Sequence, residues 1–307
     1  MANKRVIVHL SGGLGNQMFQ YMAGVALAKN SRKELVINLN WFLNPRFAHR
    51  NSSVYLTKRK VDILQFETVA KTKVDWLPTP RDGRMERFVA FISLSKRESL
   101  GVISEFNFKT SLINKNYKTR RLFGFFMSPK FFLNITPETI FNELNPSLTD
   151  WPHGMRELLK SQISIGVHIR LGDYVSLGDK VIPSEIYFLS GIERLVSILG
   201  KDAKIYFFTD EPERLKNLFP KLTGRGVTVS PPSSTTPVEN LIVLSSCTAY
   251  VCSNSTFSWW GAALSDAPKS LVVRPSYFYT AKPDEDSHAD LWAISEIRLN
   301  PITGKEE

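Results

Sequence analysis

Apolar and polar positions alternate most regularly in the second half of the chain. Buried strands are predicted at five short apolar runs: 163–169, 204–208, 227–229, 249–252 and 270–273. Helices are predicted between them, where apolar residues recur every three or four positions: 184–199, 211–219, 238–244 and 257–264. Strands that alternate with helices in this way are typical of a parallel, doubly wound α/β sheet.

The first half of the chain begins in the same way and then becomes irregular. A strand, a glycine-rich turn, a helix and a second strand are predicted at 5–10, 11–17, 17–30 and 35–39. Further along, a strand is predicted at 122–126, and helices at 84–100, from Thr136 and at 153–161. We therefore predict an N-terminal domain over 1–160 and a Rossmann-like domain over 161–307.

The composition indicates an ordinary globular protein of about two domains, since 43% of the 307 residues are hydrophobic and 22% are charged. No apolar run approaches the roughly eighteen residues of a membrane-spanning helix, and no secretory signal is recognised. The two cysteines, Cys247 and Cys252, form neither a disulfide framework nor a CxxC motif. We expect reduced core cysteines and a cytoplasmic protein.

The net charge of +10 is distributed unevenly. Residues 1–160 hold 25 Lys and Arg against 12 Asp and Glu, whereas residues 161–307 hold 14 against 17. A basic half indicates an anionic partner, such as the inner face of a membrane or an acidic glycan, and it is equally typical of a solubilising surface. Nucleic acid is disfavoured, because no nucleic-acid-binding motif is present.

The glycine-rich turn at 11–17 fails two motif tests. A P-loop would continue with Gly-Lys-Ser/Thr, which the turn lacks. A dinucleotide-binding loop would place a small residue at Met18 and an acidic residue near 38–40, and neither is present. What remains is either a tight turn or a ligand loop with two glycines and a polar tip, formed by Gly13, Gly15, Asn16 and Gln17.

Polar side chains directly follow four of the predicted strands. They are His168, Arg170 and Asp173; Asp210 and Glu211; Ser253, Asn254, Ser255 and Thr256; and Arg274. Because parallel strands share one carboxyl edge, we expect all four groups to line one rim, where open α/β sheets bind their ligands.

The first of these groups combines an imidazole, a guanidinium and a carboxylate. Residues two apart on a strand share a face, so His168 and Arg170 point the same way. The planar fork of Arg170 suits a phosphate, and the alternative is an Arg–Asp pair that only holds the turn at Gly172. His168 fits either a ligand contact or a satisfied core histidine.

The other groups also have two interpretations. Residues 253–256 precede a helix, where hydroxyls and backbone N–H groups either seat an anion or cap the helix. Asp210 and Glu211 can accept the N–H donors of a guanine edge or a ribose hydroxyl pair, and they can also cap a helix. No metal site is predicted, because the acidic triplet at 284–286 fits a solvated turn better and no His/Cys cluster has zinc spacing.

Three stretches in this order resemble the α-1,2-fucosyltransferases of glycosyltransferase family 11. They are Gly12-Gly13-Leu14-Gly15-Asn16-Gln17-Met18-Phe19-Gln20-Tyr21, Val167-His168-Ile169-Arg170-Leu171-Gly172-Asp173-Tyr174 and Ser253-Asn254-Ser255-Thr256-Phe257-Ser258-Trp259-Trp260-Gly261, and Phe208-Thr209-Asp210-Glu211 also fits. The family usually carries His-x-Arg-Arg-Gly-Asp, and here Leu171 replaces the second arginine. Arg170 is then the phosphate arginine, and Arg274 is a further candidate for the missing charge.

The resemblance implies a GT-B-like α/β architecture, with two Rossmann-type domains facing across a cleft. It implies inverting transfer of L-fucose from GDP-β-L-fucose to the 2-hydroxyl of a galactoside, without a required metal, in bacterial surface polysaccharide or lipopolysaccharide synthesis. The first domain would bind the glycan acceptor, and Arg170, Asp173 and His168 would be catalytic, with Asp173 the general base. The donor-binding residues would be Gly13, Gly15, Asn16, His168, Arg170, Asp210, Glu211, Ser253, Asn254, Ser255, Thr256 and Phe257.

Two rival functions stay open. A non-catalytic nucleotide-sugar or glycan-binding protein would keep the same rim and need no general base. A nucleotide phosphotransferase would also use arginine and glycine loops, but it would require Mg²⁺, and the missing P-loop lysine argues against it.

Overall fold

The computed structural model describes residues 5–43, 59–66, 71–73, 102–104, 119–133, 135–136, 148–175, 182–278, 291 and 296–307. The helix predicted at 84–100, most of the helix predicted from Thr136 and the acidic triplet at 284–286 lie outside these residues. The chain divides into two compact units, Met1–Asn145 and Pro146–Glu307. Among the described residues, no helix has both the length and the apolar character needed to cross a membrane.

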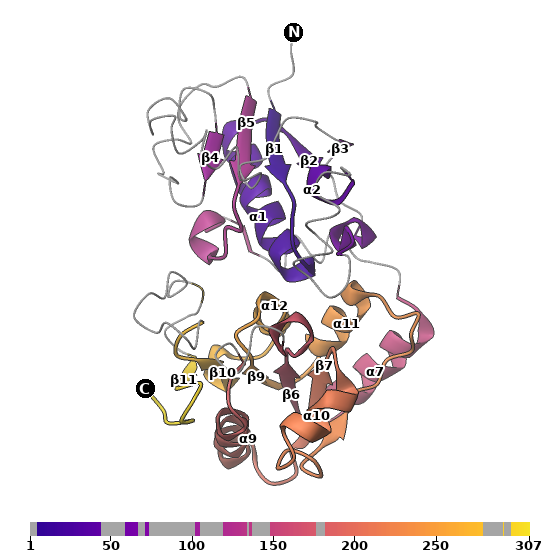
Figure 1. Ribbon diagram of the computed structural model, residues 1–307, viewed down its shortest axis with the longest axis vertical. Helices are drawn as coiled ribbons and strands as arrows, with labels where there is room; N and C mark the ends of the chain where they lie inside the picture. The colour runs from indigo at the N-terminus through magenta and orange to yellow at the C-terminus, as the bar shows by residue number, and fades with distance from the viewer. Residues whose placement is uncertain are drawn as a thin grey trace. The chain divides into compact units, whose positions relative to one another are not determined.

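The N-terminal unit is built on a parallel five-stranded sheet in the order β3-β2-β1-β5-β4 (Figure 1). Its strands are β1 Arg5–His9, β2 Glu34–Asn38, β3 Lys71–Lys73, β4 Val102–Ser104 and β5 Thr119–Phe123. The described helices are α1 Leu14–Ser31, α2 Asn40–Leu43 and the 3₁₀ turns η1 Asp62–Gln65 and η4 Pro129–Phe131. The predicted start of the chain is confirmed, and α1 begins three residues earlier than expected, directly after the glycine turn.

The C-terminal unit contains a six-stranded parallel sheet in the order β11-β10-β9-β6-β7-β8. Its strands are β6 Ser164–Ile169, β7 Lys204–Thr209, β8 Val227–Thr228, β9 Ala249–Cys252, β10 Val272–Pro275 and β11 Ile297–Leu299. Counted along the unit, this is the 3-2-1-4-5-6 order of dinucleotide-binding Rossmann folds, whose ligand crevice opens where the first and fourth strands adjoin. In this unit that point lies between β6 and β9.

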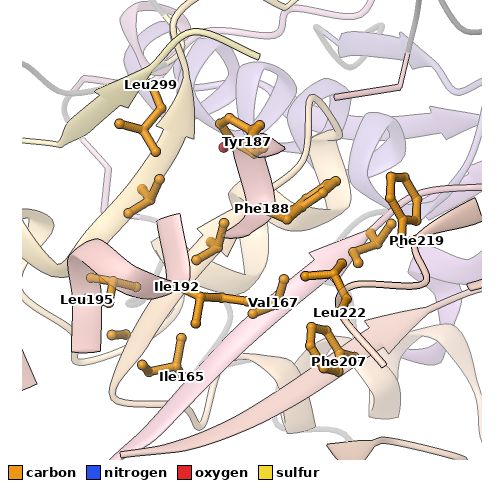
Figure 2. Packing of buried hydrophobic residues seen from close by; sticks show 14 of the residues in the cluster. Ile165, Val167, Tyr187, Phe188, Ile192, Leu195, Phe207, Phe219, Leu222 and Leu299 are labelled. Carbon is orange, nitrogen blue, oxygen red and sulfur yellow. The ribbon is translucent and has the colours of Figure 1, made fainter. Parts of the chain in front are cut away.

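Helices cover both faces of the second sheet. They are α7 Asp150–Lys160, α8 Gly172–Val175, α9 Glu185–Leu199, α10 Pro212–Leu218, α11 Pro237–Leu244, α12 Thr256–Ala263 and the 3₁₀ turn η5 Lys269–Leu271. Figure 2 shows Tyr187, Phe188 and Ile192 of α9 packed with Ile165 and Val167 of β6. Gly166 faces the opposite side of β6. A Cβ atom added there would meet Leu244, the last residue of α11, and Cys247, which follows it, so helices lie close to both faces of the sheet.

The division between the units lies at 145/146, whereas the sequence predicted it at 160/161. Helix α7 belongs to the C-terminal unit, because it packs on α11 and its leading residue is bound there. Thr149 donates its backbone N–H to the carboxylate of Glu239 at 3.0 Å and its hydroxyl at 2.7 Å. The same carboxylate closes a capping box with Thr236 at the start of α11. This contact spans ninety residues and has no local signature in the sequence.

Candidate functional site

The four polar groups predicted at the rim belong to four adjacent strands or to the turns that follow them, with His168 inside β6 and Arg274 inside β10. In the sheet order, β10, β9, β6 and β7 are consecutive, and each pairs in parallel with its neighbour. Hydrogen bonds and ring contacts join the groups after β6, β7 and β9. The structure therefore brings three of the four predicted groups together at one edge of the sheet.

Arg170 forms an ion pair with the carboxylate that follows the neighbouring strand β7. Its Nη1 lies 2.5 Å from Asp210 Oδ2, and the two side chains are 20% and 29% exposed. Asp210 Oδ1 also accepts the backbone N–H of Leu171 at 2.9 Å. The parallel register of Ile169 with Thr209 places these residues side by side. Asp210 thus holds the β6 turn, and its predicted contact with guanine or ribose stays a prediction.

Gly172 is required for space at this turn. It opens α8 without a positive φ, so backbone conformation does not account for a glycine here. A Cβ atom at this position would collide with Oδ2 of Asp210. Asp173 follows in the same turn, but its side chain lies outside the described residues, and its role as general base stays a prediction.

Tyr174 is a residue of this site that sequence reasoning missed. The Arg170 guanidinium carbon lies 5.9 Å from the centre of its ring, within the range of a cation–π contact. The Tyr174 hydroxyl donates to the backbone carbonyl of Asn254 at 3.2 Å, which links the β6 turn to the segment after β9. An aromatic residue four positions after an arginine in one short turn was the available signal.

His168 is buried and neutral. Its Nδ1 lies 2.6 Å from the hydroxyl of Ser258 and 3.4 Å from that of Ser253, and its ring stacks at 5.2 Å on Phe257. Burial lowers its pKa to about 4, although the nearby charge of Asp210 acts in the opposite direction. This packing is compatible with both predicted interpretations, a ligand contact and a satisfied core histidine. The sequence did not indicate the hydrogen bond of His168 to Ser258 on α12.

Most polar side chains of the segment after β9 form hydrogen bonds to other groups of the protein. Ser253 and Asn254 are fully buried, and their side chains bind Ser258 Oγ at 3.0 Å and the carbonyl of Phe278 at 2.7 Å. Ser255 is the N-cap of α12, where its hydroxyl accepts the N–H of residue 257. Thr256 and Phe257 are partly exposed, and they therefore form most of the solvent-exposed surface of this segment.

Glu211 lies beside the rim, and among the described residues its carboxylate forms only a long ion pair with Arg214. It is the N-cap residue of α10, and its carboxylate lies 3.9 Å from the guanidinium of Arg214 on the next turn. Its backbone N–H is accepted by the hydroxyl of Thr209. Its carboxylate makes no capping hydrogen bond to α10, and its predicted contact with the donor stays a prediction.

Arg274 lies within β10 and is buried. Its side chain is 8% exposed and its Nε lies 3.8 Å from the carboxylate of Glu296, which is 5% exposed. Its Nη1 donates to the carbonyl of Pro275 at 3.1 Å. Arg274 therefore stabilises the junction of β10 with the segment before β11. Its predicted use as a second phosphate arginine stays a prediction.

Leu171, which replaces the second arginine of the family motif, is a core residue. It is fully buried in the cluster that also contains Leu215 and Phe219 of the α10 region. Arg170 and Leu171 both lie beyond the end of β6, so the burial of Leu171 follows from its packing in this cluster. The turn after β6 therefore contributes one arginine, Arg170, to the site, and Leu171 contributes to the packing of the core.

In the N-terminal unit, Gln17 stabilises the glycine turn. The side chain is fully buried, and its Nε2 donates to the carbonyls of Gly12 at 3.0 Å and Lys60 at 2.8 Å. Its Oε1 accepts the N–H of Ile63 at 3.1 Å. The prediction that Gln17 is part of a polar tip facing a ligand is therefore wrong, because every polar atom of its side chain is used within the unit.

Gly13 and Asn16 are the residues of the glycine turn that keep partial exposure. Gly13 is the N-cap of α1, and the Arg59 guanidinium would lie 3.7 Å from a Cβ atom placed there. Asn16 is partly exposed, whereas Gly15 is buried. Arg59 was not predicted, because it is sequence-distant from the turn. Donor binding by these residues stays a prediction.

No group of three or more His, Cys, Asp or Glu side chains arranged to hold a metal ion occurs within the described ranges. The metal independence expected from the sequence is a separate question and stays a prediction.

Comparison with known proteins identifies relatives of the whole chain. A model of the family described as Glycosyl transferase family 11 matches residues 102–291. An α-1,2-colitosyltransferase of Escherichia coli is 25% identical over 281 residues, covering 89% of this chain and 92% of that protein. The O-antigen biosynthesis glycosyltransferase WbnK of Escherichia coli is 26% identical over 306 residues, covering 92% and 98%.

The fold also has solved counterparts. The crystal structure of the fucosyltransferase NodZ from Bradyrhizobium aligns with a TM-score of 0.50 at 16% identity, covering 86% of this chain and 94% of that one. A structure of NodZ, an α-1,6-fucosyltransferase, co-crystallised with GDP gives the same TM-score. This likeness confirms the predicted architecture of two Rossmann-type domains, and the cleft expected between them stays a prediction.

Proposed function

The chain belongs to glycosyltransferase family 11 and is a glycosyltransferase, and we propose that it transfers L-fucose from GDP-β-L-fucose to the 2-hydroxyl of a galactoside. The observation that carries this proposal is the guanidinium of Arg170. It stands at the carboxyl edge of β6, next to the point where Rossmann sheets bind nucleotides, and its side chain is partly exposed. A guanidinium that is held by an ion pair at this position is suited to bind the phosphates of a nucleoside diphosphate.

The proposed reaction is a single displacement with inversion. The acceptor oxygen forms a bond to C1 of fucose while the bond from C1 to the β-phosphate oxygen breaks, and GDP leaves with the electron pair. Arg170 stabilises the negative charge that develops on the diphosphate, and the backbone N–H groups at the start of α12 support it. Because a guanidinium supplies this charge, we propose that the reaction needs no metal ion.

The hydroxyl proton of the acceptor must also be removed. We assign this step to Asp173, which lies three residues after Arg170 in the same turn, two residues after the N–H that Asp210 binds. The ion pair of Arg170 with Asp210 supports this assignment, because the arginine has a carboxylate partner other than Asp173. His168, which is neutral, is assigned to donor binding beside Arg170.

The acceptor and the cellular setting are inferred from the relatives. One is named for O-antigen biosynthesis and the other for α-1,2 transfer, so we propose a galactose-terminated surface glycan and a 1,2-linkage. The N-terminal unit would bind this acceptor, and its excess of Lys and Arg would support contact with an anionic membrane from the cytoplasmic side. A second candidate donor is GDP-colitose, whose sugar is fucose without its 3-hydroxyl, because one relative is a colitosyltransferase.

The test is release of GDP from GDP-fucose in EDTA, with lactose or N-acetyllactosamine as acceptor. We expect acceptor-dependent release that survives EDTA and falls by about 10²–10³ in Arg170→Ala, since one lost charge-stabilising donor has this effect. Arg225→Ala is the matched control, because Arg225 is exposed and pairs only weakly with Glu193 at 3.8 Å. Full dependence on added metal, or an unchanged rate in Arg170→Ala, would contradict the proposal.

The same assay separates the remaining alternatives. GDP-colitose in place of GDP-fucose identifies the donor by the higher kcat/KM, and NMR of the product identifies the linkage. GDP-fucose binding without turnover on any galactoside would favour a non-catalytic nucleotide-sugar-binding protein.

A further inference from the structure

We infer that Asp210 is a positioning residue, which holds the Arg170 guanidinium and the turn after β6 in the geometry required for the leaving diphosphate. It does so without contacting the nucleotide itself. The inference deepens the proposed function and rests on it. It differs from the expectation that Asp210 reads the guanine edge or the ribose hydroxyls.

The first argument is that both oxygens of this carboxylate are engaged by the β6 turn. Oδ2 pairs with Arg170 Nη1 at 2.5 Å, and Oδ1 accepts the backbone N–H of Leu171 at 2.9 Å. One side chain therefore fixes the guanidinium and the peptide that follows it. A guanidinium has five N–H donors, so a bond to Asp210 and a contact with a diphosphate are compatible.

The second argument is that the turn is shaped around the carboxylate. Gly172 leaves the space that Oδ2 of Asp210 occupies, because a Cβ atom there would collide with it. The φ of Gly172 is not positive, so backbone conformation does not explain a glycine at this position. Close approach of Asp210 is thus the feature that the glycine permits.

The third argument is that Arg170 also contacts the ring of Tyr174. Tyr174 places its ring 5.9 Å from the guanidinium carbon, and its hydroxyl bonds to the backbone of Asn254 after β9. Arg170 is therefore bracketed by groups linked to both neighbouring strands, β7 and β9. Such preorganisation is valuable in catalysis, since a misplacement of about 1 Å can cost about 10²-fold in rate.

The test is a double-mutant cycle with Asp210→Asn, Arg170→Ala and the double variant. Asn keeps the size of Asp and an oxygen acceptor for Leu171, but it loses the ion pair. We expect Asp210→Asn to lower kcat by about 10–100-fold with little change in KM for GDP-fucose. The double variant should be no slower than Arg170→Ala alone, because Asp210 acts through Arg170.

Direct nucleotide contact by Asp210 would give a different pattern. The loss in Asp210→Asn would then appear mainly as weaker GDP binding, with binding of inorganic pyrophosphate unchanged. The two substitutions would also be additive in the double variant. Either result would overturn the inference while leaving the proposed function intact.

Gly172→Ala perturbs the same carboxylate without removing it. We expect this variant to reproduce the fall in kcat of Asp210→Asn, because the added methyl group displaces Oδ2. The matched control is Gly154→Ala on α7, where an added Cβ meets nothing within 4 Å and activity should be unchanged. Circular dichroism and thermal melting verify that each variant is folded. A wild-type chain that neither binds GDP nor turns over GDP-fucose would overturn the proposed function, and this inference with it.

Discussion

At the scale of single residues, His168 combines a rim position with a core environment. Its imidazole is 7% exposed, bonded to Ser258 through Nδ1 and stacked on Phe257. The sequence left open whether it is a ligand contact or a satisfied core histidine. It could not decide, because the partners of His168 come from a helix ninety residues away, and only the folded chain places them against the ring.

The burial of His168 predicts a pH-dependent stability. Its folded pKa of about 4 lies below its usual value of 6.5, so the unfolded chain binds the extra proton between these values. The free energy of unfolding should therefore fall as the pH drops from 6.5 towards 4, and should not depend on His168 above 6.5. Relative to His168→Gln, the wild type should lose about 2 kcal/mol between pH 7.5 and pH 5.

Urea denaturation of both proteins at the two pH values checks this expectation. The comparison with His168→Gln cancels the carboxylates that titrate in the same range. Equal pH dependence of the two proteins would show that His168 is not held neutral by burial.

At the scale of elements, close packing of α1 on the first sheet depends on Gly24. A Cβ atom at this position would overlap Cγ2 of Val8 on β1 and lie 3.0 Å from Cδ1 of Leu35 on β2. Gly24→Ala should therefore lower the free energy of unfolding by about 1–3 kcal/mol through overpacking. Gly154→Ala, which meets open space on α7, should raise it by about 0.5–1 kcal/mol through helix propensity.

Chemical denaturation of these two variants beside the wild type measures the difference. If Gly24→Ala were as stable as Gly154→Ala, the described contact of α1 with β1 and β2 would be contradicted.

Element positions in the second half were largely predictable from the sequence. The pattern there is strong because buried strands and amphipathic helices alternate, and the predicted bounds agree with the observed ones to within two residues. The short strand β11 was missed, since three residues carry too little periodicity. Helix α9 buries Tyr187 and Phe188, whereas the neighbouring Ile186 is 52% exposed.

At the scale of the whole molecule, the local sequence pattern predicts the fold class, whereas long-range contacts decide the domain boundary and the partners of the site residues. Strand–helix alternation was enough to predict the C-terminal Rossmann-like domain and a shared polar rim, whereas the second Rossmann-type domain was implied by the family resemblance. The alternation did not reveal that α7 belongs to the second unit, because the deciding contact joins Thr149 to Glu239. Nor did it reveal that Asp210 binds Arg170, since residue identity shows a carboxylate at the rim but not its partner.

The measurement that tests the central claim most directly is calorimetric titration of the complete chain with GDP in EDTA. We expect saturable binding at one site per chain, weakened by at least about tenfold in Arg170→Ala, as loss of a charge-assisted contact implies. Arg225→Ala should bind GDP as the wild type does. If the wild-type chain bound no GDP, the assignment of the rim around Arg170 as a GDP-sugar site would be contradicted.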